Sequence, residues 1–146
     1  MTTTRLYFRK IEDHDVADVR TLPVGAHLVT PRRAYTHHGI YVGGGRVVHY
    51  SGSSRSLQIG PVEEVSIENF SRGRPVRVRP HRGSAFSAAE IASRARSRLG
   101  ENHYDVFRNN CEHFCEWCIR GANTSYQIDR WLELPRQFAA ALGALR

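Results

Sequence analysis

The side chain best suited to nucleophilic chemistry is the thiol of Cys111, which lies in the run Asn109-Asn110-Cys111-Glu112-His113-Phe114. Asparagine is a favoured helix N-cap, so this run predicts a helix over residues 109–120 that ends at Gly121. Cys111 then falls in the first turn, where unpaired N–H groups and the helix dipole lower the pKa of a thiol. Such a thiol is a catalytic nucleophile when a base stands beside it, and a buried structural cysteine otherwise.

Three histidines could provide that base: His37, His38 and His49. All three lie in a predicted β-hairpin over Tyr35–Tyr50 whose turn is the glycine run Gly43–Gly45. A three-residue turn places His49 opposite Gly39 and puts His37 diagonally beside it on the same face. A two-residue turn pairs His49 with His38 instead and turns His37 away. The spacing alone leaves both registers open.

The cysteines invite two readings as metal ligands. All three lie close together, at Cys111, Cys115 and Cys118, so they cannot form a disulfide framework, and a reducing compartment is favoured. Their spacing is associated with [4Fe–4S] radical enzymes, but those enzymes carry it near the start of a large barrel. A zinc site that adds His113 would take every ligand from one helix, which fits tetrahedral geometry poorly. We therefore expect no metal and no cofactor, and place Cys115 and Cys118 in the core.

Short strands and helices must position these residues. Strands are predicted over residues 26–30 and 75–80, and short strands or an irregular connection over 57–59 and 62–70. The clearest helix covers residues 86–99, where Ser87 and Glu90 form a capping box and Gly100 provides the stop. Its predicted apolar face comprises Ala88, Ile91, Ala92, Ala95 and Leu99, and its predicted solvent side carries Arg94 and Arg98.

These elements predict an α+β fold in which an antiparallel sheet packs on helices. The chain has 146 residues, of which 40% are hydrophobic and 24% charged, which suits one globular domain over 1–146. We expect a core over about residues 24–121, an N-terminal arm over 1–22 and a short helical tail over 135–146. No apolar run approaches the ~18–20 residues of a membrane span, and no secretory signal is visible.

The charge of the chain is strongly positive. Lysine and arginine number 21 against 14 acidic residues, and all but Lys10 are arginine. Arginine pairs with phosphates and carboxylates through two hydrogen bonds, which indicates an anionic partner, although the base composition of a gene raises arginine content equally well. The arginines are scattered without an aromatic platform, so nucleic acid is an unlikely partner. A non-enzymatic module that binds an anionic surface stays open.

Two motifs carry a resemblance to a known family. The stretch Tyr35-Thr36-His37-His38-Gly39-Ile40-Tyr41-Val42-Gly43, which leads to Val47-Val48-His49, resembles the H-box of the lecithin retinol acyltransferase-like family. Asn110-Cys111-Glu112-His113-Phe114 resembles the NCEHF signature of that family. The order of the motifs also agrees, with the histidines first and the cysteine near the C-terminus. The resemblance covers about Val24 to Gly121.

The resemblance assigns roles to four residues. His37 matches the general base of the family, His49 the second histidine that orients or polarises it, and Cys111 the nucleophile. Tyr35 matches a tyrosine that contacts the oxyanion. The implied fold is a circularly permuted papain-like core of the NlpC type, and the implied register is the one with a three-residue turn. The implied reaction is cysteine-dependent acyl transfer or hydrolysis, with a phospholipid or other acyl donor.

The chain also departs from this family. His38 stands where animal members commonly have tryptophan. We also expect no C-terminal membrane anchor of the kind those members have, since the apolar tail Phe138–Leu145 is too short to cross a bilayer. We expect a cytoplasmic protein without a transmembrane segment, open to peripheral association with an anionic membrane. A papain-like peptidase or amidase is the alternative function, because that class cleaves amides with the same residues.

Overall fold

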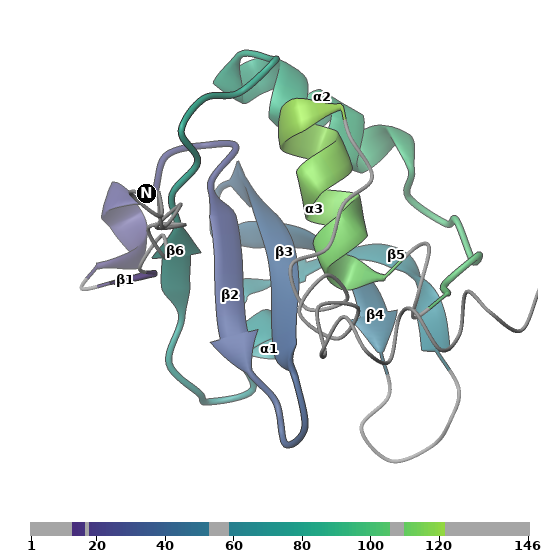
Figure 1. The fold of residues 1–146 in the computed structure, drawn as a ribbon. Helices are drawn as coiled ribbons and strands as arrows, with labels where there is room; N and C mark the ends of the chain where they lie inside the picture. Colours follow the sequence, from purple (N-terminus) through teal and green to yellow (C-terminus); the bar gives the residue numbers. More distant parts are fainter. Residues whose placement is uncertain (1–12, 17, 53–58, 106–109, 122–146) are drawn as a thin grey trace, which may run out of the picture.

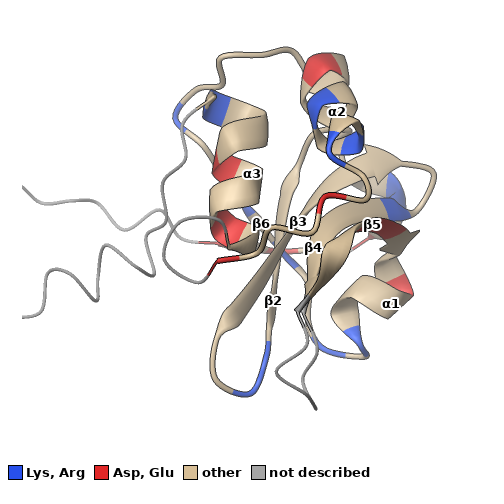
Figure 2. Cartoon of the chain, turned by 90° about the vertical axis from the view of Figure 1, so that its right-hand side faces the viewer, with Lys and Arg blue, Asp and Glu red and all other residues tan. Residues whose placement is uncertain are grey.

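The structure is a computed structural model that describes residues 13–16, 18–52, 59–105 and 110–121. These residues form an α+β arrangement of a six-stranded antiparallel sheet and α-helices on both of its faces (Figures 1 and 2). The expected fold class is confirmed at this level. The expected arm over 1–22 is described only in part, as β1 and a 3₁₀ turn at Val19–Thr21, and the expected tail over 135–146 lies outside the described residues.

The sheet has the strand order β1-β6-β2-β3-β4-β5, and every neighbouring pair is antiparallel. The strands are β1 (His14–Asp15), β2 (His27–Pro31), β3 (Thr36–Gly43), β4 (Arg46–Gly52), β5 (Ile59–Ser66) and β6 (Arg77–Arg79). The predicted strands at 26–30 and 75–80 correspond to β2 and β6. Residues 57 and 58 of the prediction over 57–59 lie outside the described part.

Alternation of side chains along β3 and β4 divides the core in two. Ile40, Val48 and their neighbours pack on one face with α2 (Ala88–Ser97) and α3 (Cys111–Arg120). Tyr41 and Val47 pack on the other face with α1 (Ile67–Ser71). Figure 2 shows this layering, with the sheet between α1 and the other two helices. The sheet thus separates two sets of side chains that meet only at its edges and ends.

The β3–β4 hairpin follows the register of the three-residue turn over most of its length. Gly39 pairs with His49, Ile40 with Val48 and Tyr41 with Val47, but a bulge then pairs Gly43 with Arg46. The bulge leaves Gly44 and Gly45 as the turn, both with positive φ angles, of 60° and 73°. Glycine is the residue that adopts this conformation at no steric cost. His37 and His49 therefore share a face, as the resemblance implied.

Two of the helices differ in part from their predictions. The capping box of Ser87 and Glu90 is present at the start of α2, as predicted. The placement of Arg94 and Arg98 in solvent is wrong: Arg94 lies 3.9 Å from the ring centroid of Trp117, and Arg98 is largely buried beside Glu101. Leu99, predicted in the core, is 45% exposed. The predicted strand or irregular connection over 62–70 is β5 followed by α1, a helix that the sequence analysis missed.

The reason for the error at Arg94 is the aromatic surface beneath it. The guanidinium of Arg94 lies between the rings of Phe86 and Trp117 and donates a hydrogen bond to the Trp117 carbonyl oxygen at 2.8 Å. A guanidinium is weakly hydrated and stacks on aromatic faces. It can therefore pack over the edge of a hydrophobic core, where a strongly hydrated ammonium would stay in water. Arg94 consequently joins α2 to α3.

No helix among the described residues is long and apolar enough to cross a bilayer.

Candidate functional site

Cys111 is the first residue of α3, as predicted. The Asn110 side chain accepts a hydrogen bond from the His113 backbone N–H at 2.9 Å, and the ring of His113 accepts one from the Asn110 backbone N–H at 3.1 Å. This reciprocal cap fixes the start of the helix and therefore the position of the thiol. Cys111 is only 2% exposed and packs in the cluster formed by α2, α3 and the sheet.

The thiol meets the sheet where the pairing of β3 with β4 stops. The ladder ends at the pair Gly39–His49. The Tyr41 N–H donates to Ala26, on the β2 side. Because N–H directions alternate along a strand, the N–H of His38, an odd number of residues from Tyr41, points to the β4 side. The His38 N–H donates a hydrogen bond to the Cys111 thiol, one residue beyond the last pair of the ladder. The Cys111 sulfur is thus held next to the end of the ladder.

His37 and His49 form a hydrogen-bonded chain with Glu63 at the same end of the ladder. Nε2 of His37 lies 2.6 Å from Nδ1 of His49, and Nε2 of His49 lies 3.0 Å from Oε1 of Glu63. An ionised carboxylate only accepts, so His49 donates to Glu63 and His37 donates to His49. The lone pair on Nδ1 of His37 is then the one left to accept a proton.

The two histidines and the cysteine reach this point from opposite faces of the sheet. The rings of His37 and His49 contact Phe70, on the α1 face, whereas Cys111 belongs to the cluster on the α3 face. Within the described residues, no hydrogen bond joins the Cys111 sulfur to either ring. The structure therefore brings His37 and His49 together and places Cys111 at the same end of the β3–β4 ladder.

Burial governs the protonation of the thiol. It raises the pKa of Cys111 to about 11, against the opposing effect of the N–H groups of His38 and Glu112 that point at the sulfur. The expected lowering of this pKa by the helix start is therefore wrong for the resting structure, since desolvation outweighs the helix N–H groups. Burial, together with the charges of His49, Arg32 and Arg72, holds the pKa of His37 well below its usual value of 6.5.

Neutral thiol and neutral imidazole are thus the resting forms at pH 7. A neutral imidazole can take the proton of a thiol during attack on a carbonyl, which is general-base catalysis. Burial also lowers the pKa of His49, although its hydrogen bond to Glu63 acts in the opposite direction. General-base catalysis of this kind requires no resting ion pair between thiolate and imidazolium.

Two tyrosines border the thiol. Tyr35, which is 39% exposed, presents an edge to His37 at 6.2 Å between ring centroids, and burial and the nearby Cys111 raise its pKa. Tyr104 lies between Tyr50 and the helix start, and its hydroxyl accepts a hydrogen bond from the Cys111 N–H. Neither Tyr104 nor Glu63 is among the residues that the sequence motifs indicate. Tyr104 follows α2 in an irregular segment, and Glu63 is an alternate residue of a strand, so neither stands in a motif.

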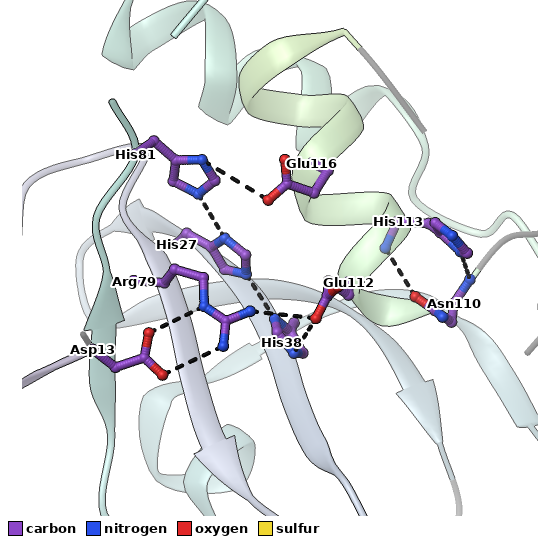
Figure 3. A network of polar contacts seen from close by, with 9 residues as sticks. All are labelled: Asp13, His27, His38, Arg79, His81, Asn110, Glu112, His113 and Glu116. Carbon is purple, nitrogen blue, oxygen red and sulfur yellow. Dashed lines mark hydrogen bonds and ion pairs between the residues drawn. The ribbon is translucent and has the colours of Figure 1, made fainter. Parts of the chain in front are cut away.

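His38 belongs to a second polar cluster on the α3 face (Figure 3). Its Nδ1 lies 2.8 Å from Nε2 of His27, and its Nε2 lies 3.2 Å from the carboxylate of Glu112. His27 continues to His81 at 2.8 Å, and Arg79 joins Glu112 to Asp13. His38 is therefore engaged away from His49, which agrees with the register described above.

The remaining cysteines occupy the core, as predicted. Cys115 and Cys118 are fully buried in the cluster of α2 and α3, and all three cysteines carry free thiols. The ring of His113 is occupied in the cap of the helix. Across the described ranges, the grouping of possible metal ligands that the structure contains does not include the cysteines; it comprises His27, His81 and Glu116.

Comparison with known proteins gives concordant matches. A family model described as lecithin retinol acyltransferase matches residues 20–124. Lecithin retinol acyltransferase from Bos taurus and from Homo sapiens are each 31% identical over 136 residues, which cover 75% of this chain and 59% of theirs. Protein LEAD-SENSITIVE 1 from Arabidopsis thaliana is 26% identical over 69% of this chain and 58% of its own length. The chain thus spans about three fifths of the length of these relatives.

Proposed function

Because this chain belongs to the lecithin retinol acyltransferase family, we propose that it transfers an acyl group through a thioester on Cys111. The observation that carries the proposal is the meeting of three groups at the end of the β3–β4 ladder. These are the thiol of Cys111, the hydrogen-bonded pair of His37 and His49, and the His38 backbone N–H that donates to the sulfur. A nucleophile, an oriented base and a donor for an oxyanion are the parts that acyl transfer needs.

In the first step, Nδ1 of His37 takes the proton of the Cys111 thiol while the sulfur attacks the carbonyl carbon of the donor. The oxyanion formed is held by backbone N–H groups that face the sulfur in the resting structure, those of His38 and of the helix start, with Tyr35 as a further contact. Collapse breaks the ester bond, and the departing alcohol oxygen takes the proton from His37. The enzyme is left as a thioester.

In the second step, an acceptor completes the reaction. Water, an alcohol or an amine loses its proton to His37 and attacks the thioester, and the sulfur leaves with the proton from His37. His49 keeps the His37 ring in one tautomer throughout, because its Nδ1 accepts from Nε2 of His37 and its own Nε2 donates to Glu63. Hydrolysis and transfer thus differ only in the acceptor.

The same arrangement supports a circularly permuted papain-like core of the NlpC type. In this chain the histidine strands β3 and β4 precede the cysteine helix α3, and α3 packs on β3. A helix that starts at the nucleophile and rests on the strand of the base is the arrangement this class implies. The proposed core therefore comprises the hairpin of β3 and β4 together with α3.

A phospholipid is the proposed acyl donor. Arg32 and Arg72 act on both His37 and His49 through their charge, and the exposed Arg33 and Arg74 flank them in the chain. Guanidinium groups so placed suit the phosphate of a lipid head group and the surface of an anionic membrane. Peripheral attachment to such a membrane is part of the proposal, as is a cytoplasmic location, which suits three free thiols.

The test is an intact-mass measurement after incubation with phosphatidylcholine vesicles, with and without an anionic lipid. We expect the wild-type chain to gain the mass of one acyl group and Cys111→Ala to gain none. Cys118→Ser is the matched control, because that thiol is buried in the core away from the proposed base, and it should be acylated like the wild type. An adduct on Cys111→Ala, or undiminished lipid turnover by it, contradicts the proposal.

A further inference from the structure

The cluster on the α3 face contains a buried carboxylate that makes no hydrogen bond. Glu116 of α3 has a side chain with no exposed surface, and neither of its carboxylate oxygens makes a hydrogen bond. Its nearest charged neighbours, the ring of His81 and the guanidinium of Arg120, are 3.9 and 4.0 Å away, which is too far for hydrogen bonds. A buried carboxylate is costly unless something compensates it.

Two imidazoles stand beside this carboxylate. Nδ1 of His27, on β2, lies 2.8 Å from Nε2 of His81, which follows β6, and Figure 3 shows His81 between His27 and Glu116. One ligand atom from each of the three residues lies within 4.8 Å of the others. We propose that His27, His81 and Glu116 bind a divalent cation of the Zn²⁺ class, with water or another ligand in the fourth position.

The donor set fits that class of ion. Two imidazole nitrogens and one carboxylate oxygen are common ligands of zinc, at about 2.0–2.2 Å from the metal, so the ligand atoms of a tetrahedral site are about 3.3 Å apart. Nδ1 of His27 and Nε2 of His81 are closer than that spacing, at 2.8 Å, and the ligand atoms of the three residues lie up to 4.8 Å apart, so side chains must move to reach it. His81 can move, because its side chain lies at the edge of the cluster and is 13% exposed, whereas His27 and Glu116 are buried.

A second layer of hydrogen bonds orients His27 for such a bond. With Nδ1 on the metal, Nε2 of His27 carries the hydrogen and donates to Nδ1 of His38, whose Nε2 in turn donates to the carboxylate of Glu112. Histidine ligands of metals commonly donate their other ring N–H in this way, which fixes the tautomer. The hydrogen bonds from Glu112 to His27 thus give the fully buried side chain of His38 a role, whereas the proposed acyl transfer uses only its backbone N–H.

The charges of the cluster admit a cation. Asp13, Glu112 and Glu116 contribute three negative charges, against the positive charges of Arg79 and Arg120. Arg79 is held by Asp13 and Glu112, and the half-exposed Arg120 can turn toward water. The bound ion would join β2, the segment after β6 and α3, and so would hold the helix of Cys111 against the sheet.

The experiment uses the full chain without a polyhistidine tag, stripped of metal with a chelator. Zn²⁺ is titrated in competition with a chromophoric chelator, and Co²⁺ is added to a second sample for its visible spectrum. We expect one equivalent of Zn²⁺ to bind, an affinity at least 100-fold lower in His81→Ala and in Glu116→Gln, and a Tm rise with Zn²⁺ in the wild type that these two variants lack. His14→Ala, an exposed histidine on β1, is the matched control and should bind like the wild type.

Three outcomes overturn the proposal: no stoichiometric binding to the wild type, undiminished binding in both His81→Ala and Glu116→Gln, or a sulfur-to-cobalt charge-transfer band that disappears in Cys115→Ser. The last outcome would move the metal to the cysteines. His38→Ala is expected to lose about 10- to 100-fold in affinity, as a residue that orients a ligand. Cys111→Ala should bind Zn²⁺ normally, so the failure of this proposal and that of acyl transfer are distinguishable.

Discussion

At the scale of single residues, the proposed chemistry depends on two groups that are both neutral at rest. The Cys111 thiol keeps its proton because burial raises its pKa to about 11, and His37 stays unprotonated because burial lowers its pKa. Proton transfer then accompanies attack, in contrast to enzymes whose cysteine is already a thiolate. Positioning of the histidine ring consequently matters more than the acidity of the thiol.

The first prediction compares the two adjacent histidines. His37→Ala should lower kcat/KM for a phospholipid by about 10²- to 10⁴-fold, the usual contribution of a general base, with little change in Tm. His38→Ala should chiefly lower Tm, because it leaves the buried Glu112 without one of its partners. Steady-state kinetics and thermal melts of both variants make the comparison. A larger loss of kcat/KM in His38→Ala would show that the base is misassigned.

The second prediction concerns Glu63, which is half exposed and holds His49. A hydrogen bond with a charged partner contributes about 1.5–3 kcal/mol, and solvent reduces that figure, so Glu63→Gln should lower kcat by about tenfold. The free energy of unfolding should change by less than about 1 kcal/mol. Glu68→Gln, an exposed acid on α1, is the control. A kcat of Glu63→Gln equal to that of the wild type would show that Glu63 does not support His49 in the proposed reaction.

The sequence allowed the prediction of these residues to different degrees. Cys111, His37 and His49 could be selected because their types and their place in a cap or a hairpin indicate chemistry. Glu63 and Tyr104 could not, since they become neighbours of the site only through the pairing of β4 with β5 and the path of the chain after α2. Their contacts depend on tertiary structure, which no local pattern encodes.

At the scale of elements, local sequence signals predicted where helices start better than they predicted which side chains of a helix are buried. The capping boxes at Ser87 and Asn110 involve residues three apart, so the sequence contains the whole interaction. Arg94 was misplaced because its partners, Phe86 and Trp117, include a residue of another helix. The helix α1 was missed because it is one short turn that directly continues a strand.

The third prediction tests the packing of the hairpin under the histidine pair. A Cβ atom at Gly39 would lie 2.6 Å from a methyl carbon of Val47 and 2.8 Å from the ring of Phe70, both closer than contact allows. Gly39→Ala should therefore destabilise the fold by about 1–3 kcal/mol, measured by urea unfolding, and displace the ring on which His37 and His49 rest. Gly83→Ala has open space around it and should be neutral or slightly stabilising. Equal stability of the two variants would contradict the close packing.

At the scale of the whole molecule, the buried histidines and thiols set the pH range of stability. Burial holds the pKa of His27, His37 and His38 well below 6.5, so the unfolded chain binds more protons than the folded one as the pH falls below that value. Burial raises the pKa of Cys111 and Cys115 above 9, so the folded chain retains more protons above that value. The free energy of unfolding therefore falls both as the pH drops below about 6.5 and as it rises above about 9.

The fourth prediction follows from this linkage. The free energy of unfolding should be largest between about pH 6.5 and pH 9 and should fall outside that window, as measured by urea unfolding across the pH range. Glu116 acts in the opposite direction, since burial raises its pKa to about 6 and its contribution is lost as the pH rises past that value. His37→Phe should flatten the acid limb. A stability that keeps rising below pH 6.5 would contradict the neutral state of these histidines.

The early end of the β3–β4 ladder has a consequence for how such a fold can change. Had the two strands remained paired for one more residue, Tyr50 would have met His38, and the amide hydrogen now directed at sulfur would have been consumed by ordinary sheet formation. The proposed reaction therefore depends on where these two strands diverge. Insertions that lengthen the β3–β4 pairing would abolish the proposed acyl transfer without altering any of the proposed catalytic side chains.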